Sequence, residues 1–318
     1  MSNGASSTVT HGTHDHQDDT RNAEIVIGLN GELVPRAQAV VSVFDSGFIL
    51  GDGIWEGIRV HNGKLAFIDD HLRRLYEGAA ALDLDIGLSR DELTDQIMAT
   101  LAANGMGPGT DGVHIRLMVT RGMKSTPYQD PRFTITPPTI VIIPEYKDPR
   151  PETLTKGIRL ATVSVRRGRP DVQDPKLNSH SKINCITACI QATKAGADEG
   201  LMLDPQGFVA TCNSTHFFIV REGDDGPEVW TSTGDYCLPG ITRANVLRLC
   251  RRWGITEREK NFSVSQVYGA DEAFVTGTFA GIAPVTEVDG RTIGTGERGP
   301  ITQQLQEKYL ELIAEATR

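Results

Sequence analysis

The 318-residue sequence lacks the marks of several large protein classes. No apolar run approaches the roughly 20 residues that a membrane-spanning helix needs, and the N-terminus lacks the basic and then apolar layout of a signal peptide. Its 32 lysines and arginines are scattered and are outnumbered by 41 acidic residues, which argues against nucleic acid as a partner. We therefore expect a cytoplasmic protein that binds neither nucleic acid nor membranes.

Cysteine is scarce as well, with five residues and no CxxC pair of metal-binding spacing, so free thiols are expected. Residues 1–23 have almost no apolar content. Such a segment gains too little from burial to offset the entropy of ordering, so we expect a mobile tail. His11, His14 and His16 beside Asp15 would at most hold a metal ion loosely, and no metal site is expected.

The remaining chain is long enough for two domains of an α/β class. Apolar periodicity and turn residues predict helices at 70–81, 90–103, 183–195 and from 300 onward, the second opened by a capping box of Ser89 and Glu92. Strands are predicted at 25–27, 39–43, 112–120, 138–144, 158–165, 200–203, 208–211 and 217–220. Prolines among charges mark a linker at 149–156, between a small domain, 24–148, and a large one, 157–318.

One turn is typical of a phosphate site. The run Leu238-Pro239-Gly240-Ile241-Thr242-Arg243 leads into an amphipathic helix that Gly254 ends. Free backbone N–H groups and the helix dipole favour a dianion there. The alternative is that Pro-Gly merely turns the chain into a helix.

Read with three other segments, this turn resembles the class IV, fold-type IV pyridoxal-phosphate enzymes, which include branched-chain and D-amino acid aminotransferases and aminodeoxychorismate lyase. The other segments are Gly51–Arg59, His71–Leu75 and Val275–Val285, and the resemblance covers about residues 24 to 313. It implies a small α/β domain, a large domain with a mostly antiparallel β core, pyridoxal 5'-phosphate as cofactor, and a homodimer.

The resemblance also implies roles for single residues. The phosphate would be bound by Arg74, Gly240, Ile241, Thr242 and Thr278, and the substrate by Trp55, Arg59, His114, Arg116 and Phe279. The lysine that forms the internal aldimine would be Lys182, with Lys176 as its rival. The spacing from Lys182 to Glu199 is about four residues shorter than in the family, and counting without a gap falls between the two lysines.

One position departs from the family pattern. Thr211 stands where the family has a glutamate bonded to the pyridine nitrogen. A hydroxyl shares only a neutral hydrogen bond, so the ring would withdraw electrons less strongly.

His180 and His216 are further candidates for proton transfer, and Arg166, Arg167 and Arg169 form a basic loop.

The function that the resemblance implies is transfer of an amino group from an amino acid or amine to a 2-oxo acid, through the lysine internal aldimine. Two alternatives stay open. One is a lyase of the aminodeoxychorismate lyase type, and the other is a non-catalytic protein that binds pyridoxal phosphate.

Overall fold

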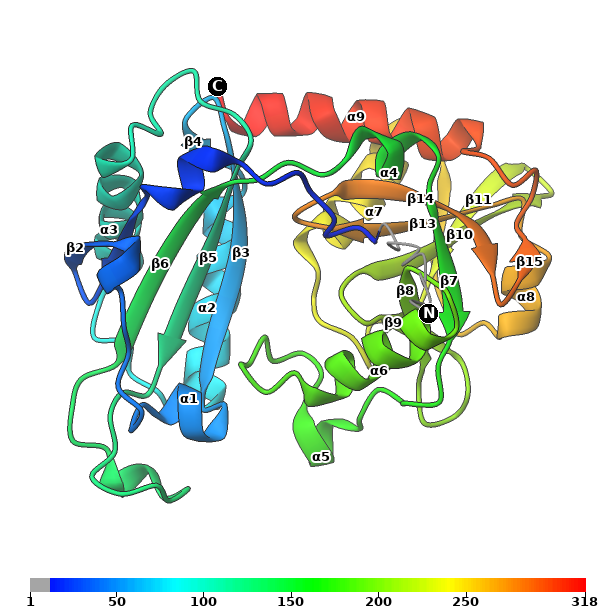
Figure 1. The fold of residues 1–318 in the computed structure, drawn as a ribbon. Helices are drawn as coiled ribbons and strands as arrows, with labels where there is room; N and C mark the ends of the chain where they lie inside the picture. Colours follow the sequence, from blue (N-terminus) through cyan, green and yellow to red (C-terminus); the bar gives the residue numbers. More distant parts are fainter. Residues whose placement is uncertain (1–11) are drawn as a thin grey trace, which may run out of the picture.

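The computed structural model describes residues 12–318 and contains two β-sheets that stand side by side (Figure 1). The amino-terminal sheet has the order β2-β1-β6-β5-β3-β4, and all its neighbouring strands are antiparallel. Its strands are β1 (Val26–Leu29), β2 (Glu32–Pro35), β3 (Gly53–His61), β4 (Lys64–Leu65), β5 (Val113–Thr120) and β6 (Thr139–Tyr146). All of them precede the expected linker.

The carboxy-terminal sheet has the order β12-β11-β10-β13-β14-β7-β8-β9, with β15 paired to β14. The pairs β11/β12, β14/β7 and β7/β8 are parallel and the others antiparallel. Its strands are β7 (Ile158–Thr162), β8 (Glu199–Leu203), β9 (Val209–Cys212), β10 (His216–Gly223), β11 (Gly226–Thr231), β12 (Thr256–Glu259), β13 (Glu272–Gly277), β14 (Gly281–Val288) and β15 (Arg291–Thr292).

Helices cover both sheets. The α-helices are α1 (Ser46–Leu50), α2 (Ile68–Ala81), α3 (Arg90–Ala103), α4 (Pro151–Thr155), α5 (Pro170–Gln173), α6 (Ile183–Lys194), α7 (Ile241–Trp253), α8 (Val264–Tyr268) and α9 (Pro300–Ala316), and 3-10 turns lie at Thr20–Ala23, Arg36–Gln38 and Pro131–Phe133. No helix within residues 12–318 is both long and apolar enough to cross a membrane. The expected linker contains α4.

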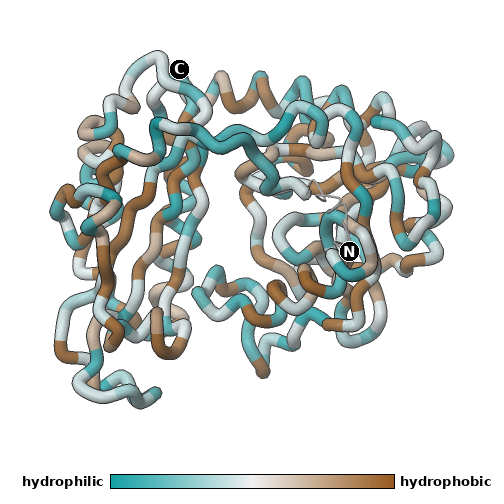
Figure 2. The backbone as a smooth tube through the Cα atoms, in the orientation of Figure 1, coloured by the Kyte–Doolittle hydropathy of each residue, from teal (hydrophilic) through white to brown (hydrophobic). Residues whose placement is uncertain are grey.

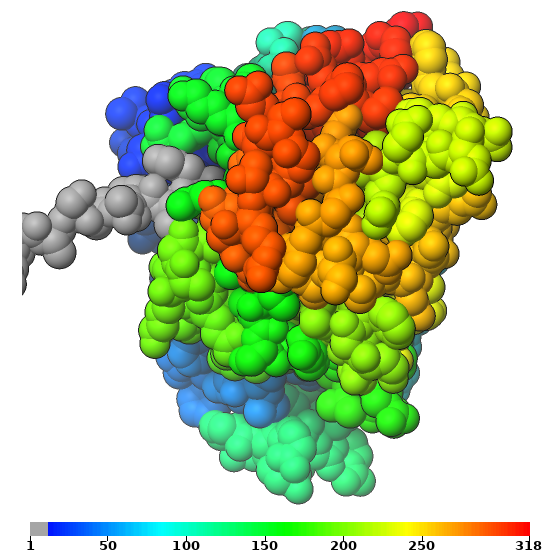
Figure 3. All heavy atoms as spheres, turned by 90° about the vertical axis from the view of Figure 1, so that its right-hand side faces the viewer, coloured from blue at the N-terminus to red at the C-terminus, as the bar shows by residue number. Residues whose placement is uncertain are grey.

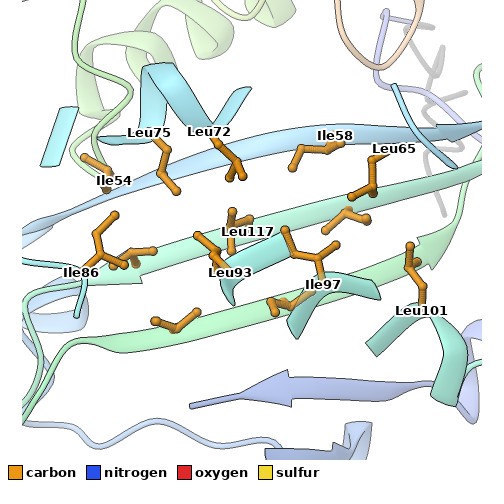
Figure 4. Packing of buried hydrophobic residues seen from close by; sticks show 14 of the residues in the cluster. Ile54, Ile58, Leu65, Leu72, Leu75, Ile86, Leu93, Ile97, Leu101 and Leu117 are labelled. Atoms are coloured by element: carbon orange, nitrogen blue, oxygen red, sulfur yellow. The ribbon is translucent and has the colours of Figure 1, made fainter. Parts of the chain in front are cut away.

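Alternation along β3 gives the amino-terminal sheet two different faces. Ile54 and Ile58 pack with Leu72 of α2 and with Leu93 and Ile97 of α3 in one apolar core (Figure 4). Burying each such side chain contributes about 1.5–3 kcal/mol. Since successive side chains of a strand point to opposite faces, Trp55 and Gly57 face the carboxy-terminal sheet instead. Apolar residues accordingly concentrate in the strands (Figure 2).

Most predicted elements are present, including the helix at 90–103 with both hydrogen bonds of its capping box. The predicted strand at 39–43 is wrong. Asn30 and Gly31 have φ of 53° and 85°, and a two-residue turn of this kind sends the chain straight back, so Glu32–Pro35 pairs with β1. Val40 and Val43 are 75% and 66% exposed instead.

The carboxy-terminal helix spans both halves of the molecule. Figure 1 shows α9 running along the top from the carboxy-terminal sheet toward the amino-terminal one, and Figure 3 shows it as the upper edge of the large half. At its end the Lys64 ammonium donates to the Arg318 main-chain oxygen. The two sheets are therefore tied together on this side as well as through the linker.

Residues 12–23, expected to be mobile, have a defined course. Thr13 is buried, and Asn22 exchanges two hydrogen bonds with the main chain of Tyr146. The physical reason is that polar anchors, rather than apolar burial, fix this segment. The expectation for residues 1–11, His11 included, lies outside the described residues.

Candidate active site

A cavity of about 660 Å³ lies between the two sheets. All predicted site residues except Arg59 line it: Trp55, Arg74, His114, Arg116, Lys182, Thr211, Gly240, Ile241, Thr242, Thr278 and Phe279. They come from β3, α2, β5, the start of α6, β9, the start of α7 and the turn after β13. The fold thus gathers residues that are far apart in the sequence.

Lys182 is the only lysine among the lining residues that the structure describes. It is the N-cap residue of α6, and its Nζ lies 5.5 Å from the centre of the Trp55 ring. Its predicted rival, Lys176, is exposed and lies outside the cavity. The pocket therefore offers a single amine.

The pKa of Lys182 falls to about 8. The first cause is removal of the amine from bulk solvent, and the positive charges of Arg167 and Arg74 add to it. A pKa of about 8 leaves roughly a tenth of the amine unprotonated at pH 7, whereas an ordinary lysine has less than about a thousandth. The amine is thus available as a nucleophile near neutral pH.

Asn178, four residues before Lys182, also lines the cavity. Its side-chain amide donates to the Trp55 carbonyl (2.6 Å), and Trp55 N–H donates back to the Asn178 carbonyl (3.0 Å). The Oδ1 atom of Asn178 is buried and has no hydrogen-bond partner. These bonds attach the loop before α6 to β3 and so bring Lys182 against Trp55.

Arg74 reaches the start of α7, where its Nη1 donates to the Pro239 carbonyl (2.8 Å). Its Nε and Nη2 donate to the two carboxylate oxygens of Glu56 (2.8 and 2.7 Å). The terminal nitrogens keep further N–H groups that are free to bind an anion. The guanidinium is therefore fixed in place beside the helix terminus.

Glu56 is a residue that the sequence reasoning missed. It is fully buried on the helix-facing side of β3 and also binds Nδ1 of His71 (2.7 Å). Burial alone would raise the pKa of this carboxyl, but Arg74 and His71 outweigh it and the pKa is lowered. The sequence signal was its alternation with Trp55 and Gly57, which places a charge on the core side of the strand.

The start of α7 forms the other wall of this end of the cavity. The first N–H groups of an α-helix have no partner within the helix, and Ile241 and Thr242 occupy those positions here. The Thr276 hydroxyl, two residues before Thr278, lines the cavity and is buried without a hydrogen-bond partner. Together with Arg74, these groups form a donor set suited to a dianion.

Gly240 is required by close packing. A Cβ at this position would lie 2.3 Å from Cε1 of His216, whose Nε2 donates to the Leu238 carbonyl (2.7 Å). Burial lowers the pKa of His216 to about 3, so it is neutral. His180 likewise donates to the Ile54 carbonyl (3.0 Å). Both histidines are thus held to the main chain through Nε2.

The opposite wall comes from the amino-terminal sheet. Trp55 of β3 faces the cavity, and Arg116 of β5 lies over its ring at 3.8 Å. His114, two residues before Arg116, packs edge-on against Phe279 at 5.5 Å. Burial, followed by the charge of Arg116, lowers the pKa of His114, so this wall combines one cation with a neutral imidazole.

Thr211 is buried on β9, and its hydroxyl donates to the Thr215 carbonyl (2.7 Å). None of the lining residues within the described part of the chain is Asp or Glu. Arg167 from the predicted basic loop also lines the cavity, where its guanidinium contacts Cys185 Sγ (3.3 Å). The described lining therefore contains no carboxylate in place of the one missing at Thr211, and its charged groups are cations.

Arg59 is the exception among the predicted residues. It binds Asp148 (2.6 Å) and lines a neighbouring cavity of about 440 Å³ under α9. The two cavities share the wall from Thr278 to Ala280 and the first residues of α7. Since Lys182 lies only in the larger one, we assign that cavity as the candidate active site.

Comparison with known proteins agrees with this geometry. Residues 53–288 match the model of the family described as amino-transferase class IV. The chain belongs to this family. Among class IV relatives, it is 40% identical over 291 residues to branched-chain-amino-acid aminotransferase-like protein 2 of Arabidopsis thaliana, covering 92% of this chain and 51% of that protein. It is 41% identical over 288 residues to the putative branched-chain-amino-acid aminotransferase of Methanocaldococcus jannaschii, covering 90% and 96%.

A solved class IV structure shares the fold. The T.th. branched-chain amino acid aminotransferase, complexed with N-(5'-phosphopyridoxyl)-L-glutamate, superimposes with a TM-score of 0.83 at 30% identity and covers 93% of this chain and 95% of that one. The chain spans about half the length of the two Arabidopsis relatives that it matches. The predicted fold type is therefore confirmed.

Proposed function

We propose that this chain is a pyridoxal-phosphate-dependent aminotransferase that moves an amino group between an amino acid or amine and a 2-oxo acid. The observation that carries the proposal is the single amine of Lys182, with its pKa of about 8, in a cavity that also holds Arg74 and the start of α7. An amine of low pKa and a dianion site are the two features that a phosphorylated aldehyde requires.

The donor set fits this cofactor. Arg74, the N–H groups of Ile241 and Thr242, the turn at Thr278 and the unpaired Thr276 hydroxyl would hold its phosphate. When bound, pyridoxal phosphate would supply an aldehyde that takes up amino groups and a ring that withdraws electrons from the substrate carbon.

The chain's own residues would perform the remaining steps. As a free amine, Lys182 Nζ accepts the proton that leaves the substrate α-carbon and later returns it. Arg116 binds a substrate carboxylate, and Trp55 and Phe279 shield the substrate from water. Thr211 would contact the ring nitrogen as a neutral group.

The test is borohydride reduction of the holoenzyme followed by peptide mapping. We expect the label on Lys182 alone, and Lys182→Ala should lose both the label and amino transfer to 2-oxoglutarate. Lys176→Ala is the matched control, because Lys176 is exposed outside the cavity, and it should keep both. Label on Lys176 would contradict the assignment. Release of pyruvate without amine exchange would indicate the lyase instead.

We also propose a homodimer. Ile183, Ile186 and Ile190 are 72%, 51% and 49% exposed on α6, spaced so that they share one helix face. An exposed apolar stripe of this kind is typical of a protein contact. A cytoplasmic location remains a prediction from the sequence.

A further inference from the structure

The segment before the first strand brings an imidazole into the candidate active site. Thr13 and His14 both line the cavity. The Thr13 hydroxyl donates to the buried Glu199 carboxylate, which also accepts a hydrogen bond from the Thr215 hydroxyl (2.7 Å). The segment is therefore anchored to the carboxy-terminal sheet immediately before His14.

A second anchor follows His14 at once. Asp15 forms an ion pair with Arg150 (2.8 Å), and His16 forms a β-bridge with Pro149. With one anchor before His14 and one after it, the main chain at His14 is held in place at the wall of the cavity. The cavity nevertheless keeps its volume of about 660 Å³, so the segment forms a wall and does not fill the pocket.

The His14 ring lines the cavity and stacks on Phe279, with centroids 5.6 Å apart and planes 8° apart. The pKa of His14 is lowered to about 4. The first cause is desolvation of the ring by the protein around it, and the positive charges of Lys147 and Arg116 add to the effect. The imidazole is thus neutral at pH 7, with one N–H to donate. Its neighbourhood holds positive charge and, among the lining residues described, no acid.

His14 also lies within reach of a substrate. Trp55 contacts both the Lys182 amine and Arg116, and Phe279, on which His14 stacks, also packs against His114, two residues before Arg116. When the reacting carbon of a substrate lies at Lys182, the side chain of that substrate therefore shares the cavity with Arg116 and His14. A neutral N–H donor beside a guanidinium favours a carboxylate over an alkyl group.

We propose that His14 is a specificity-determining residue, which donates a hydrogen bond to the distal carboxylate of a dicarboxylic substrate beside Arg116. The proposal rests on the proposed function, and it assigns a role to a segment that precedes the part of the chain matched by the family model.

The test compares two unreactive ligands, glutarate and 4-methylvalerate, by calorimetry on the holoenzyme. His14→Phe retains an aromatic ring to stack on Phe279 but removes the N–H group. We expect it to weaken glutarate binding about tenfold, the value of one hydrogen bond to a charged group, and to change 4-methylvalerate binding less than about twofold. The ratio of kcat/KM for 2-oxoglutarate and 4-methyl-2-oxovalerate should fall by a similar factor.

Two further variants keep the result interpretable. Thr13→Val removes the anchor to Glu199 and should reproduce the loss of glutarate preference, whereas Gln17→Ala, at an exposed position of the same segment, should not. Equal weakening of both ligands, or no change in either, would overturn the proposal. Since binding is measured without turnover, an inactive wild-type enzyme that still prefers glutarate would refute only the proposed function.

Discussion

At the scale of single residues, the low pKa of Lys182 sets a pH dependence. Only the unprotonated amine reacts with an aldehyde, so the rate at which the apoprotein captures pyridoxal phosphate should rise about tenfold between pH 6 and 7 and level off above its pKa of about 8. The measurement is absorbance after rapid mixing. A rate that is flat from pH 6 to 9 would contradict the low pKa.

A variant at Arg167 tests whether nearby positive charge contributes to the low pKa of Lys182. Because its charge lowers the pKa of Lys182, Arg167→Gln should move the midpoint of the capture profile to higher pH. Arg169→Gln is the matched control, since Arg169 belongs to the same loop but is 64% exposed and paired with Asp171. The control profile should coincide with that of the wild type.

Thr211 is the other residue whose chemistry is directly testable. Thr211→Glu places a carboxylate in a cavity whose described lining has none, and a charge-assisted bond to the ring nitrogen is worth about 1.5–3 kcal/mol. We expect the single-turnover rate with an amino acid to rise about tenfold to a hundredfold. Thr211→Gln, of similar size but uncharged, is the control. If both variants react at the same rate, the charge has no part in the chemistry.

At the scale of elements, the start of α7 depends on the absence of a side chain at Gly240. Gly240→Ala would force a methyl group to within 2.3 Å of the His216 ring. We expect a loss of about 1–3 kcal/mol in the free energy of unfolding and weaker binding of pyridoxal phosphate. Chemical denaturation and absorbance titration measure the two effects.

A double-mutant cycle separates this clash from a general effect on the helix. His216→Ala removes the ring that the methyl group meets, so the double variant should be more stable than the sum of the single effects predicts. Strict additivity would show that the two positions do not interact.

The sequence predicted elements well where a local signal decided them. The helix at 90–103 is fixed by Ser89 and Glu92, and α7 by its apolar stripe and Gly254. The second strand was predicted at the wrong place because Val41 and Val43 are spaced like one face of a strand but remain exposed, and only pairing geometry distinguishes the two cases.

The sequence predicted those residues of the site that belong to the family's motifs. Arg74 and Lys182 followed from the resemblance, but Glu56 and His14 did not. The role of Glu56 depends on which side of β3 meets α2, and that of His14 depends on the hydrogen bond from Thr13 to Glu199, 186 positions further along the chain. The Asp148 carboxylate holds Arg59 in the neighbouring cavity, so its substrate role stays a prediction. The contacts of Thr13 with Glu199 and of Arg59 with Asp148 join residues so far apart in the chain that they have no local sequence signal.

At the scale of the whole molecule, the exposed face of α6 tests the proposed homodimer. Ile186→Asp would place an unpaired carboxylate in an apolar contact, which costs about 3 kcal/mol or more, so the dimer dissociation constant should rise at least about a hundredfold. Sedimentation velocity measures it. Met98→Asp, at an exposed position on α3, is the control and should leave the dimer intact. A variant at Ile186 that still sediments as a dimer would exclude this face.

The path of residues 12–16 has a practical consequence for anyone who purifies this protein. Because Thr13 and His14 line the cavity, this end of the chain contributes directly to the wall of the candidate active site. A polyhistidine tag at that end would add imidazoles and any bound nickel to the same end of the chain as the imidazole under study. Kinetic constants are therefore best measured after the tag has been cleaved.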